Sequence, residues 1–263
     1  MNKDQKNKTL LITGASSGIG YELARIHASR GGDLVLVARR ENLLKEHSSK
    51  FATDFGITAE YLAIDVTEDQ SAQKTLDFIK SKNMTIDYFA NNAGFGSAGK
   101  FCDKRIEKDL GVIKLNIQAF TEWLHAFANY LKDNRGGKIL NIGSTAGLTP
   151  GGPNQATYFA SKAYVNSLSR ALHQELKSSN VSVTLLCPGA TETEFFKTAQ
   201  ADHMEIAKNT ASAYKVALDG YNAMLNSKLE VVSGAGLYLK TMLKIMPLVP
   251  TKFILKEIEK AQD

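Results

Sequence analysis

The stretch TLLITGASSGIG, Thr9 to Gly20, decides the fold of this chain. It joins a short apolar run to a glycine-rich turn and to the start of a helical pattern. Gly14, Gly18 and Gly20 permit a tight turn and let backbone N–H groups approach an anion at a helix N-terminus, where the helix dipole favours negative charge. This strand, turn and helix predict a dinucleotide pyrophosphate site; the alternative is a plain strand-to-helix turn.

Further apolar runs rich in β-branched residues follow, which suits strands buried on both faces. Helical patterns separate them, the clearest being the apolar positions at steps of three and four over 113–131 and at steps of four over 164–176. Alternating strands and helices predict an α/β fold of the Rossmann type, a doubly wound parallel sheet of about seven strands, with ligands beyond the carboxyl ends of the strands. The predicted strands are 9–13, 34–38, 61–64, 87–90, 138–142, 181–187 and 229–233.

Composition and charge argue against a nucleic-acid-binding, disulfide-rich or metal-binding protein. The 263 residues are 43% hydrophobic and 22% charged, and the net charge of +5 is scattered, so no nucleic-acid partner is expected. Cys102 and Cys187 lie far apart and the five histidines lack paired-ligand spacing, so neither a disulfide framework nor a metal site is expected. The polar N-terminus and the lack of a long apolar run favour a soluble, cytoplasmic protein.

The end of the second predicted strand carries Ala38, Arg39 and Arg40. A carboxylate commonly stands here to bind the ribose 2′-hydroxyl of NAD. A carboxylate would repel a 2′-phosphate, whereas a guanidinium can hydrogen-bond to it. The sequence therefore predicts NADP(H) as the cofactor; the alternative is a solvated pair of surface arginines.

The helix after the fifth strand contains QATYFASKAY, which places Tyr158 one helical turn before Lys162. Both side chains project from the same helix face, close enough for the ammonium to act on the phenol. The alternative is an ordinary surface pair. Other strand ends carry small or polar residues, namely Asp65-Val66, Asn91 to Gly94, Gly143-Ser144 and Pro188-Gly189 with Thr191 and Thr193.

Together these motifs resemble the short-chain dehydrogenase/reductase family, in its single-domain branch. The matching elements are TGASSGIG, Asp65-Val66, NNAG, Asn116, Ser144, the YxxxK of Tyr158 and Lys162, and PGATET, in the expected order over residues 8 to 234. The resemblance, similar in type to 3-oxoacyl and hydroxysteroid carbonyl reductases, implies hydride transfer between a nicotinamide and a carbonyl or secondary alcohol.

The resemblance also implies roles for single residues. Tyr158 would be the acid in reduction and the base in oxidation, with a phenolate favoured by Lys162 and by the positive nicotinamide of the oxidised cofactor. Lys162 would also hold the nicotinamide ribose, Ser144 would orient the substrate oxygen, and Asn116 would maintain a water relay to the lysine. A polar residue on a solvent-facing helix side is the alternative for Asn116. The expected cofactor contacts are Gly14, Ser16, Ser17, Gly18, Ile19, Gly20, Arg39, Asp65, Val66, Asn92, Tyr158, Lys162, Pro188, Thr191 and Thr193.

The chain departs from the family pattern in two places. Ser17 stands where some NADP-dependent members carry a basic residue, so the NADP preference depends on Arg39. After a predicted catalytic domain of residues 1–236, a segment of residues 237–263 continues. Leu239, Met242, Leu243 and Met246 give it an apolar helix face interrupted by Lys240 and Lys244, Pro247 ends that helix, and Phe253, Ile254, Leu255 and Ile258 begin another. These helices pack on the domain or on a second subunit, or they lie on a membrane surface.

An apolar substrate pocket is expected from Phe95, Leu148, Phe195, Phe196 and Met204. The leading hypothesis is therefore an NADPH-dependent reductase of a hydrophobic ketone, oxoacyl or steroid-like, that forms a homodimer or homotetramer through the helices containing Asn116 and Tyr158. Three alternatives remain: secondary-alcohol oxidation, a surface-bound lipid-pathway enzyme, and a non-catalytic NADP(H)-binding scaffold or sensor. Arg39 argues against oxidation, because NADP pools favour reduction. The set Asn116, Ser144, Tyr158 and Lys162 argues against a scaffold, which needs no acid.

Overall fold

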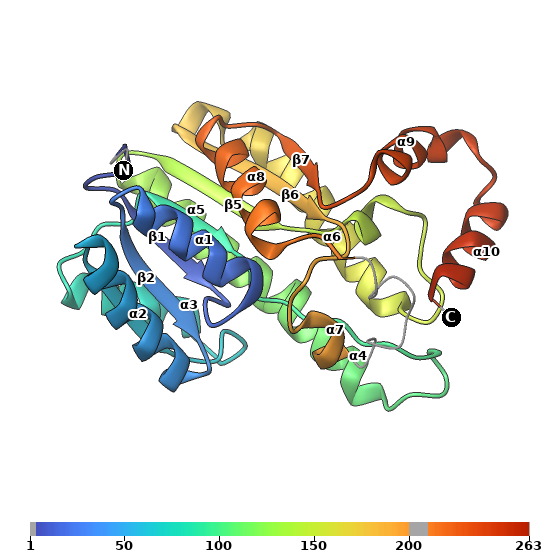
Figure 1. Ribbon diagram of the computed structural model, residues 1–263, viewed down its shortest axis with the longest axis horizontal. Helices are drawn as coiled ribbons and strands as arrows, with labels where there is room; N and C mark the ends of the chain where they lie inside the picture. The colour runs from blue at the N-terminus through green and yellow to red at the C-terminus, as the bar shows by residue number, and fades with distance from the viewer. Residues whose placement is uncertain (1–3, 200–209, 263) are drawn as a thin grey trace.

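A single seven-stranded parallel sheet organises the molecule, in the order β3-β2-β1-β4-β5-β6-β7 (Figure 1). The structure, a computed structural model, describes residues 4–199 and 210–262. The prediction of a doubly wound α/β fold with about seven strands is confirmed. The strands are β1 Thr9–Thr13, β2 Asp33–Ala38, β3 Ala59–Ala63, β4 Tyr88–Asn91, β5 Gly137–Ile142, β6 Val181–Pro188 and β7 Glu230–Ser233.

The first strand lies inside the sheet, where Leu11 pairs with Val35 of β2 on one side and with Phe89 of β4 on the other. The chain builds outward from β1 to β3, then crosses back and builds from β4 to β7 on the other side. This reversal makes the carboxyl ends of β1 and β4 a topological switch point, where α/β sheets bind their ligands.

Helices cover both faces of the sheet because both faces of its strands are apolar. Leu10 and Ile12 of β1 pack in a core with α1, α2 and α8, whereas Leu11 packs in a second core with α3, α5 and α6. The sheet is therefore buried on both sides, as the continuous apolar runs predict. The main helices are α1 Gly18–Ser29, α2 Glu41–Phe55, α3 Ser71–Ser81, α4 Ile106–Ile113, α5 Phe120–Asp133, α6 Ala156–Glu175 and α8 Ala213–Leu225.

The long helical pattern over 113–131 is interrupted. A π-helical turn, η1 Lys114–Ala119, joins α4 to α5 and contains Asn116. Such turns are rare and concentrate at functional sites. Ile113, which the pattern places on the apolar face, is exposed, and the buried positions of this stretch are Val112, Asn116, Ala119 and Phe120.

The apolar series from Tyr164 to Leu176 predicts α6 correctly but does not mark its most buried face. Tyr164 is exposed, and the fully buried side carries Ser161, Lys162 and Asn166. These polar groups can be buried because they have partners in the protein, as when Asn166 Nδ2 donates to the Ser144 carbonyl at 3.1 Å.

The last 26 described residues after Gly236 form two helices beyond the carboxyl ends of the strands, at the right of Figure 1. Pro247 lies in the 3₁₀ turn between them, where the sequence predicts the first helix to end. Across residues 4–199 and 210–262, no helix is both long and apolar enough to cross a membrane. The remaining elements are η2 Thr145–Leu148, η3 Lys177–Ser179, α7 Phe195–Ala199, α9 Leu237–Ile245, η5 Met246–Leu248 and α10 Thr251–Gln262.

Candidate active site

A cavity of about 900 Å³ opens at the carboxyl ends of the strands. This volume lies in the range of small-molecule and cofactor sites. One side, the strand-end wall, consists of the residues that follow β1 to β6 together with η1 and α6. The other side, the C-terminal wall, is provided by Leu239, Leu243, Ile258, Ala261 and Gln262.

The glycine-rich loop forms one end of the strand-end wall. Gly14 and Gly18 have φ of +69° and +56°, which other residues rarely adopt. A Cβ on Gly18 would also lie 2.8 Å from Thr193 Cγ2. The side chain of Ser17, the N-cap of α1, does not cap the helix, so the N–H groups of its first turn remain available to an anion.

Most of the predicted loop contacts do line the cavity, namely Gly14, Ser16, Ser17, Gly18 and Ile19, but Gly20 is not among the lining residues. A Cβ on Gly20 would lie 2.3 Å from the Gly14 carbonyl oxygen. Its lack of a side chain therefore serves the close packing of helix against loop, and direct cofactor contact is not needed to explain it.

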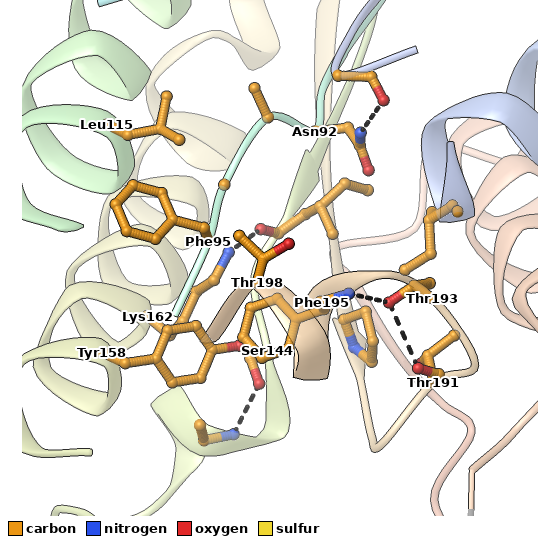
Figure 2. Close-up of a pocket in the computed structure, with 18 of the residues that line it drawn as sticks. Asn92, Phe95, Leu115, Ser144, Tyr158, Lys162, Thr191, Thr193, Phe195 and Thr198 are labelled. Carbon is orange, nitrogen blue, oxygen red and sulfur yellow. Dashed lines mark hydrogen bonds between the residues drawn. The ribbon is translucent and has the colours of Figure 1, made fainter. Parts of the chain in front are cut away.

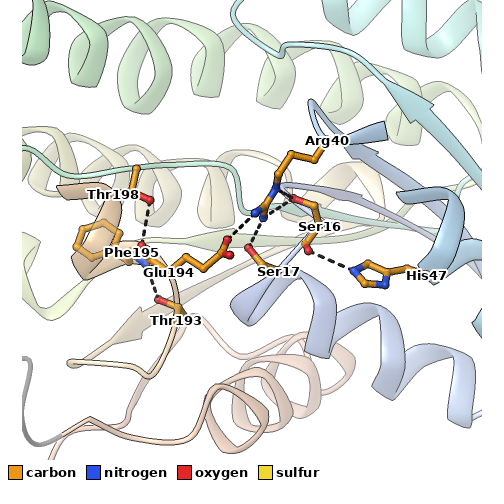
Figure 3. A network of polar contacts seen from close by, with 8 residues as sticks. All are labelled: Ser16, Ser17, Arg40, His47, Thr193, Glu194, Phe195 and Thr198. Atoms are coloured by element: carbon orange, nitrogen blue, oxygen red, sulfur yellow. Dashed lines mark hydrogen bonds and ion pairs between the residues drawn. The ribbon is translucent and has the colours of Figure 1, made fainter. Parts of the chain in front are cut away.

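The two arginines after β2 both line the cavity but lie differently. Arg39 is 76% exposed, with Nη1 3.7 Å from Asp65 Oδ2. Arg40 donates to the hydroxyls of Ser16 and Ser17, at 2.9 and 2.7 Å from Nη2, and pairs with Glu194 at 2.8 Å (Figure 3). The sequence prediction gave Arg39 the leading role and missed this position of Arg40, although the double arginine marks both.

Asp65 and Asn92 fix two further strand ends. Burial raises the pKa of Asp65, but hydrogen bonds from the Thr67 amide and hydroxyl, at 2.9 and 2.8 Å, outweigh it, and Arg39 adds to them. The pKa of Asp65 is thus lower than usual and the group is a carboxylate. Asn92 Nδ2 donates to the Thr13 carbonyl at 2.8 Å, which ties the end of β4 to the glycine loop. Both residues line the cavity, as does Val66.

Ser144, Tyr158 and Lys162 meet in the middle of the strand-end wall (Figure 2). Ser144 Oγ accepts from the Ala146 amide at 3.0 Å, which leaves its proton for another acceptor. Lys162 Nζ donates to the Ile142 carbonyl at 2.9 Å. The three side chains come from the end of β5 and from the buried face of α6, so the surface-pair alternative for Tyr158 and Lys162 is excluded.

Burial controls the protonation of this group. It raises the pKa of Tyr158 to about 12, against a hydrogen bond with Ser144 that acts in the opposite direction. Burial likewise lowers the pKa of Lys162 to about 8. The expected lowering of the phenol pKa by Lys162 is therefore not seen in the protein by itself, because desolvation of the phenolate dominates.

Asn116 is 2% exposed and is not among the residues that line the cavity. Its Oδ1 accepts from the Phe95 amide at 3.1 Å, and its Nδ2 donates to the Phe95 carbonyl at 2.9 Å and to Ser161 Oγ at 3.0 Å. A Cβ on Gly94 would lie 3.2 Å from Asn116 Oδ1 and 3.5 Å from Lys162 Nζ. The solvent-facing alternative is thus excluded, and Asn116 holds the backbone that runs beside the lysine.

The loop after β6 brings Pro188, Thr191 and Thr193 to the cavity. Thr193 Oγ1 accepts from the Phe195 amide at 3.2 Å and so starts α7 (Figure 2). The Phe195 ring lies 5.2 Å from the Tyr158 ring, between centroids.

The predicted substrate lining is partly correct. Phe95 and Phe195 line the cavity, whereas Leu148 does not. The Phe196 side chain and Met204 lie outside the described residues, as do the side chains of Lys240 and Lys244. The prediction missed the C-terminal wall, although Leu239 with Leu243, and Ile258 with Gln262, are spaced four residues apart on one helix face. It also missed Thr149, Gln155 and Thr198.

The described part of the chain contains no cluster of three or more histidine, cysteine or acidic residues that could hold a metal ion.

The family model for short chain dehydrogenase matches residues 8–204. An uncharacterized oxidoreductase of Staphylococcus epidermidis is 32% identical over 188 residues, which cover 72% of this chain and 80% of that protein. A 3-oxoacyl-[acyl-carrier-protein] reductase of Chlamydia muridarum is 28% identical over 197 residues, which cover 75% and 79%. Among solved structures, a short-chain dehydrogenase from Sphingobium yanoikuyae in complex with NADPH is 29% identical and superimposes with a TM-score of 0.80 over 97% of this chain and 98% of that one.

A Rossmann-type sheet with a glycine-rich loop and a cavity at its switch point is typical of a dinucleotide-binding protein. With the family match, the chain belongs to the short-chain dehydrogenase/reductase family.

Proposed function

We propose that this protein is an NADP(H)-dependent reductase of a hydrophobic ketone, of oxoacyl or steroid-like shape. One observation carries the proposal: Ser144, Tyr158 and Lys162 line the same cavity as the glycine loop and the two arginines. The bound nicotinamide supplies the hydride. Each remaining task, namely donating a proton, orienting the carbonyl and holding the cofactor, falls to a residue of this chain.

Tyr158 is the proposed acid. Reduction of a ketone builds negative charge on its oxygen, which needs a proton donor and hydrogen-bond partners. With a pKa of about 12, the phenol remains protonated at neutral pH and holds the proton ready for that oxygen. Ser144, whose hydroxyl proton is not used by the Ala146 amide, orients the carbonyl beside it.

Lys162 and Asn116 have supporting roles in this proposal. Lys162, buried behind the phenol, holds the nicotinamide ribose, and Asn116 positions the backbone of Gly94 and Phe95 for a water relay to the lysine. In the oxidative direction, the positive charge of Lys162 favours the phenolate that burial disfavours.

The remaining cofactor contacts follow the strand ends. Gly14, Ser16, Ser17, Gly18 and Ile19 hold the phosphates and ribose, Asp65, Val66 and Asn92 the adenosine side, and Pro188, Thr191 and Thr193 the nicotinamide amide. The observation that supports NADP(H) over NAD(H) is the pair of guanidinium groups beside the loop, Arg39 for the 2′-phosphate with Arg40 next to it. The alternative of a non-catalytic NADP(H)-binding scaffold or sensor is less well supported, because it leaves the buried acid without a task.

Thermal unfolding with NADPH and with NADH, each over a concentration series, tests the cofactor part. A larger stabilisation by NADPH at equal concentration is expected; equal shifts would contradict the preference. Reduction of apolar ketones with the preferred cofactor then tests the reaction, and binding without turnover of any ketone would favour the scaffold.

We also propose a division into a catalytic domain of residues 1–236 and an extension of residues 237–263. The turn around Leu248, 87% exposed, supports it. Limited proteolysis of the full chain is expected to cut first in the extension; a first cut within the sheet would contradict the division.

Homo-oligomerisation, as a dimer or tetramer, is proposed through the continuous helical segment of α4, η1 and α5, which contains Asn116, and through α6, which contains Tyr158. Ile106, Leu110 and Ile113 on α4 are 41–54% exposed, and Tyr164 on α6 is exposed too. Such an apolar face is typical of an interface with a second copy. Light scattering should give at least a dimer for the native chain and a smaller species for Leu110→Glu; a native monomer would contradict the proposal.

The outer edge of the extension is proposed to make a peripheral contact with an anionic membrane surface. Ile245, Leu248 and Phe253 are exposed beside the exposed cations Lys252 and Lys256. Co-sedimentation with phosphatidylserine vesicles should fall with added salt and with Leu248→Ser. Absence of binding at low salt would contradict the proposal.

A cytoplasmic location is proposed as well, supported by two cysteines without a disulfide, and cell fractionation tests it.

A further inference from the structure

The C-terminal wall brings a buried amide to the cavity. Figure 1 shows the end of α10 next to the chain that leads from β5 into α6. The contact is close: a Cβ on Gly151 in that chain would lie 3.5 Å from Leu255 Cδ2 of α10. On the same helix, Ile258, Ala261 and Gln262 line the cavity.

Gln262 is 5% exposed, and its Oε1 has no hydrogen-bond partner among the described residues. A buried acceptor without a partner costs free energy, and native proteins seldom retain one without a reason. Five other side chains of the described protein also have buried oxygens without partners, but none of them lines the cavity. Gln262 is thus distinguished by an unpartnered amide oxygen on a residue that lines the site.

A second glutamine in the lining provides a contrast. Gln155 is also 5% exposed, but it already interacts within the protein. Burial of an amide at this cavity therefore does not by itself leave it without a partner. The other members of the C-terminal wall, Leu239, Leu243, Ile258 and Ala261, have aliphatic side chains that cannot form a hydrogen bond with it.

The surroundings specify the chemistry that would satisfy this amide. All charged side chains among the described lining belong to the strand-end wall, namely Arg39, Arg40, Asp65, Lys114, Lys162 and Glu194. An ionised group beside the aliphatic C-terminal wall would lose hydration, and the described lining on that side offers it no charged partner. A hydroxyl is neutral and can donate to the unpartnered amide oxygen of Gln262. It can instead accept from the amide nitrogen if the side chain turns about its last bond.

We propose that Gln262 determines substrate choice by hydrogen-bonding a hydroxyl on the end of the ketone that lies against the C-terminal wall. The inference rests on the proposed reductase function and adds a substrate class to it: an uncharged ketone that is apolar in its middle and carries a distal hydroxyl. Tyr158 acts on the carbonyl at one wall, and Gln262 recognises the hydroxyl at the other.

The test compares pairs of ketones that differ only in the distal group. Straight-chain methyl ketones from hexanone to dodecanone, each with its counterpart bearing a terminal hydroxyl, are reduced with NADPH by the native protein, by Gln262→Leu and by Glu259→Gln. Glu259 is exposed on the same helix and does not line the cavity, so its variant is the matched control.

The native protein should prefer the hydroxylated ketone about ten-fold in kcat/KM at a chain length that spans the two walls, which corresponds to one hydrogen bond. Gln262→Leu should bring this ratio to about one and retain activity on the plain ketones, whereas Glu259→Gln should keep the native ratio. Retained activity of Gln262→Leu on the plain ketones shows that the variant is folded.

Absence of a preference at every chain length, or a preference that Gln262→Leu retains, would overturn the inference and leave the reductase function standing. If the native protein reduces no ketone at all, the proposed function falls separately. The same pairs are then compared by the thermal stabilisation that they give the NADPH-bound protein. Equal stabilisation within every pair would overturn the role of Gln262 there as well.

Discussion

The two walls of the cavity differ in polarity and in how firmly their side chains are held. In the strand-end wall, Ser144, Tyr158 and Lys162 are each less than 10% exposed and are held by neighbouring backbone or side-chain groups. In the C-terminal wall, the lining is mainly aliphatic, and the amide oxygen of Gln262 has no hydrogen-bond partner in the described part of the chain. Part of the same extension is open to solvent, with Leu248 87% and Phe253 62% exposed.

The difference indicates that the strand-end wall carries out the chemistry and that the C-terminal wall selects the substrate. Chemistry requires side chains held in fixed geometry, and the ends of sheet strands and a buried helix face provide it. Substrate choice can be altered through a peripheral segment without disturbing that geometry, because few core residues depend on it. The following variants separate the two walls, from the largest expected effect to the smallest.

Tyr158→Phe removes the acid while retaining the ring. We expect kcat for ketone reduction to fall by about 10²- to 10⁴-fold, the usual contribution of a general acid. NADPH affinity, measured by titration, should change only a few-fold. Tyr164→Phe is the control, because that hydroxyl lies one to two turns further along α6 and bonds Thr121. Substantial activity in Tyr158→Phe would contradict the assignment and with it the functional contrast between the walls.

The core at the amino end of β1, on the opposite side of the sheet from the strand-end wall, should carry a pH dependence of stability. His27 of α1 is fully buried and bridges the Lys8 carbonyl, 3.0 Å from Nε2, and the Tyr221 hydroxyl, 2.6 Å from Nδ1. Because a carbonyl only accepts, Nε2 carries the proton and Nδ1 accepts from Tyr221. Burial lowers the pKa of His27 to about 4 from its ordinary 6.5.

The unfolded chain therefore binds a proton between pH 6.5 and 4 that the folded protein does not, so stability falls as pH falls through this window. The loss should reach about 3 kcal/mol at the acid end. Denaturant unfolding at several pH values measures it. His27→Gln should flatten the dependence, whereas the exposed His125→Gln should leave it unchanged. An unchanged slope in His27→Gln would show that other groups cause it.

Arg39→Asp tests the cofactor end of the strand-end wall. It replaces a possible phosphate partner with a repelling charge, so the ratio of NADPH to NADH affinity should fall by about 10- to 100-fold. Arg40→Ala is the informative comparison, since Arg40 contacts the loop hydroxyls directly. If only the Arg40 variant changes the ratio, the phosphate is held by Arg40.

Leu243→Ala should have the smallest effect and affect the substrate alone. Loss of a partly buried leucine from the C-terminal wall costs about 1 kcal/mol of apolar contact, so KM for an apolar ketone should rise about five-fold. The affinity for NADPH should stay as it is. Ile245→Ala, at an exposed position of the same helix that does not line the cavity, is the control. Equal effects of both variants would show that α9 acts through stability and not as a wall.

The sequence by itself determined the sheet, the family and the polar strand ends. Strands buried on both faces need continuous apolar runs, and the loop after β1 needs glycines. A short stretch of consecutive residues is therefore enough to predict each of these features. The strand beginning at Thr9 and ending at Thr13 agrees with the prediction to the residue. Tyr158 and Lys162 could be paired from their four-residue spacing on one helix, whereas Ser144 was indicated by its place at a strand end and by the family resemblance.

Only the tertiary structure decided the rest. Asn116 proved to be buried in a π-turn, and Gly20 serves packing. Burial raised the pKa of Tyr158, which the spacing to Lys162 does not reveal. Gln262 reached the cavity from a helix 100 residues beyond Lys162. Desolvation and long-range packing depend on what surrounds a residue in space, and no local pattern in the sequence encodes those neighbours.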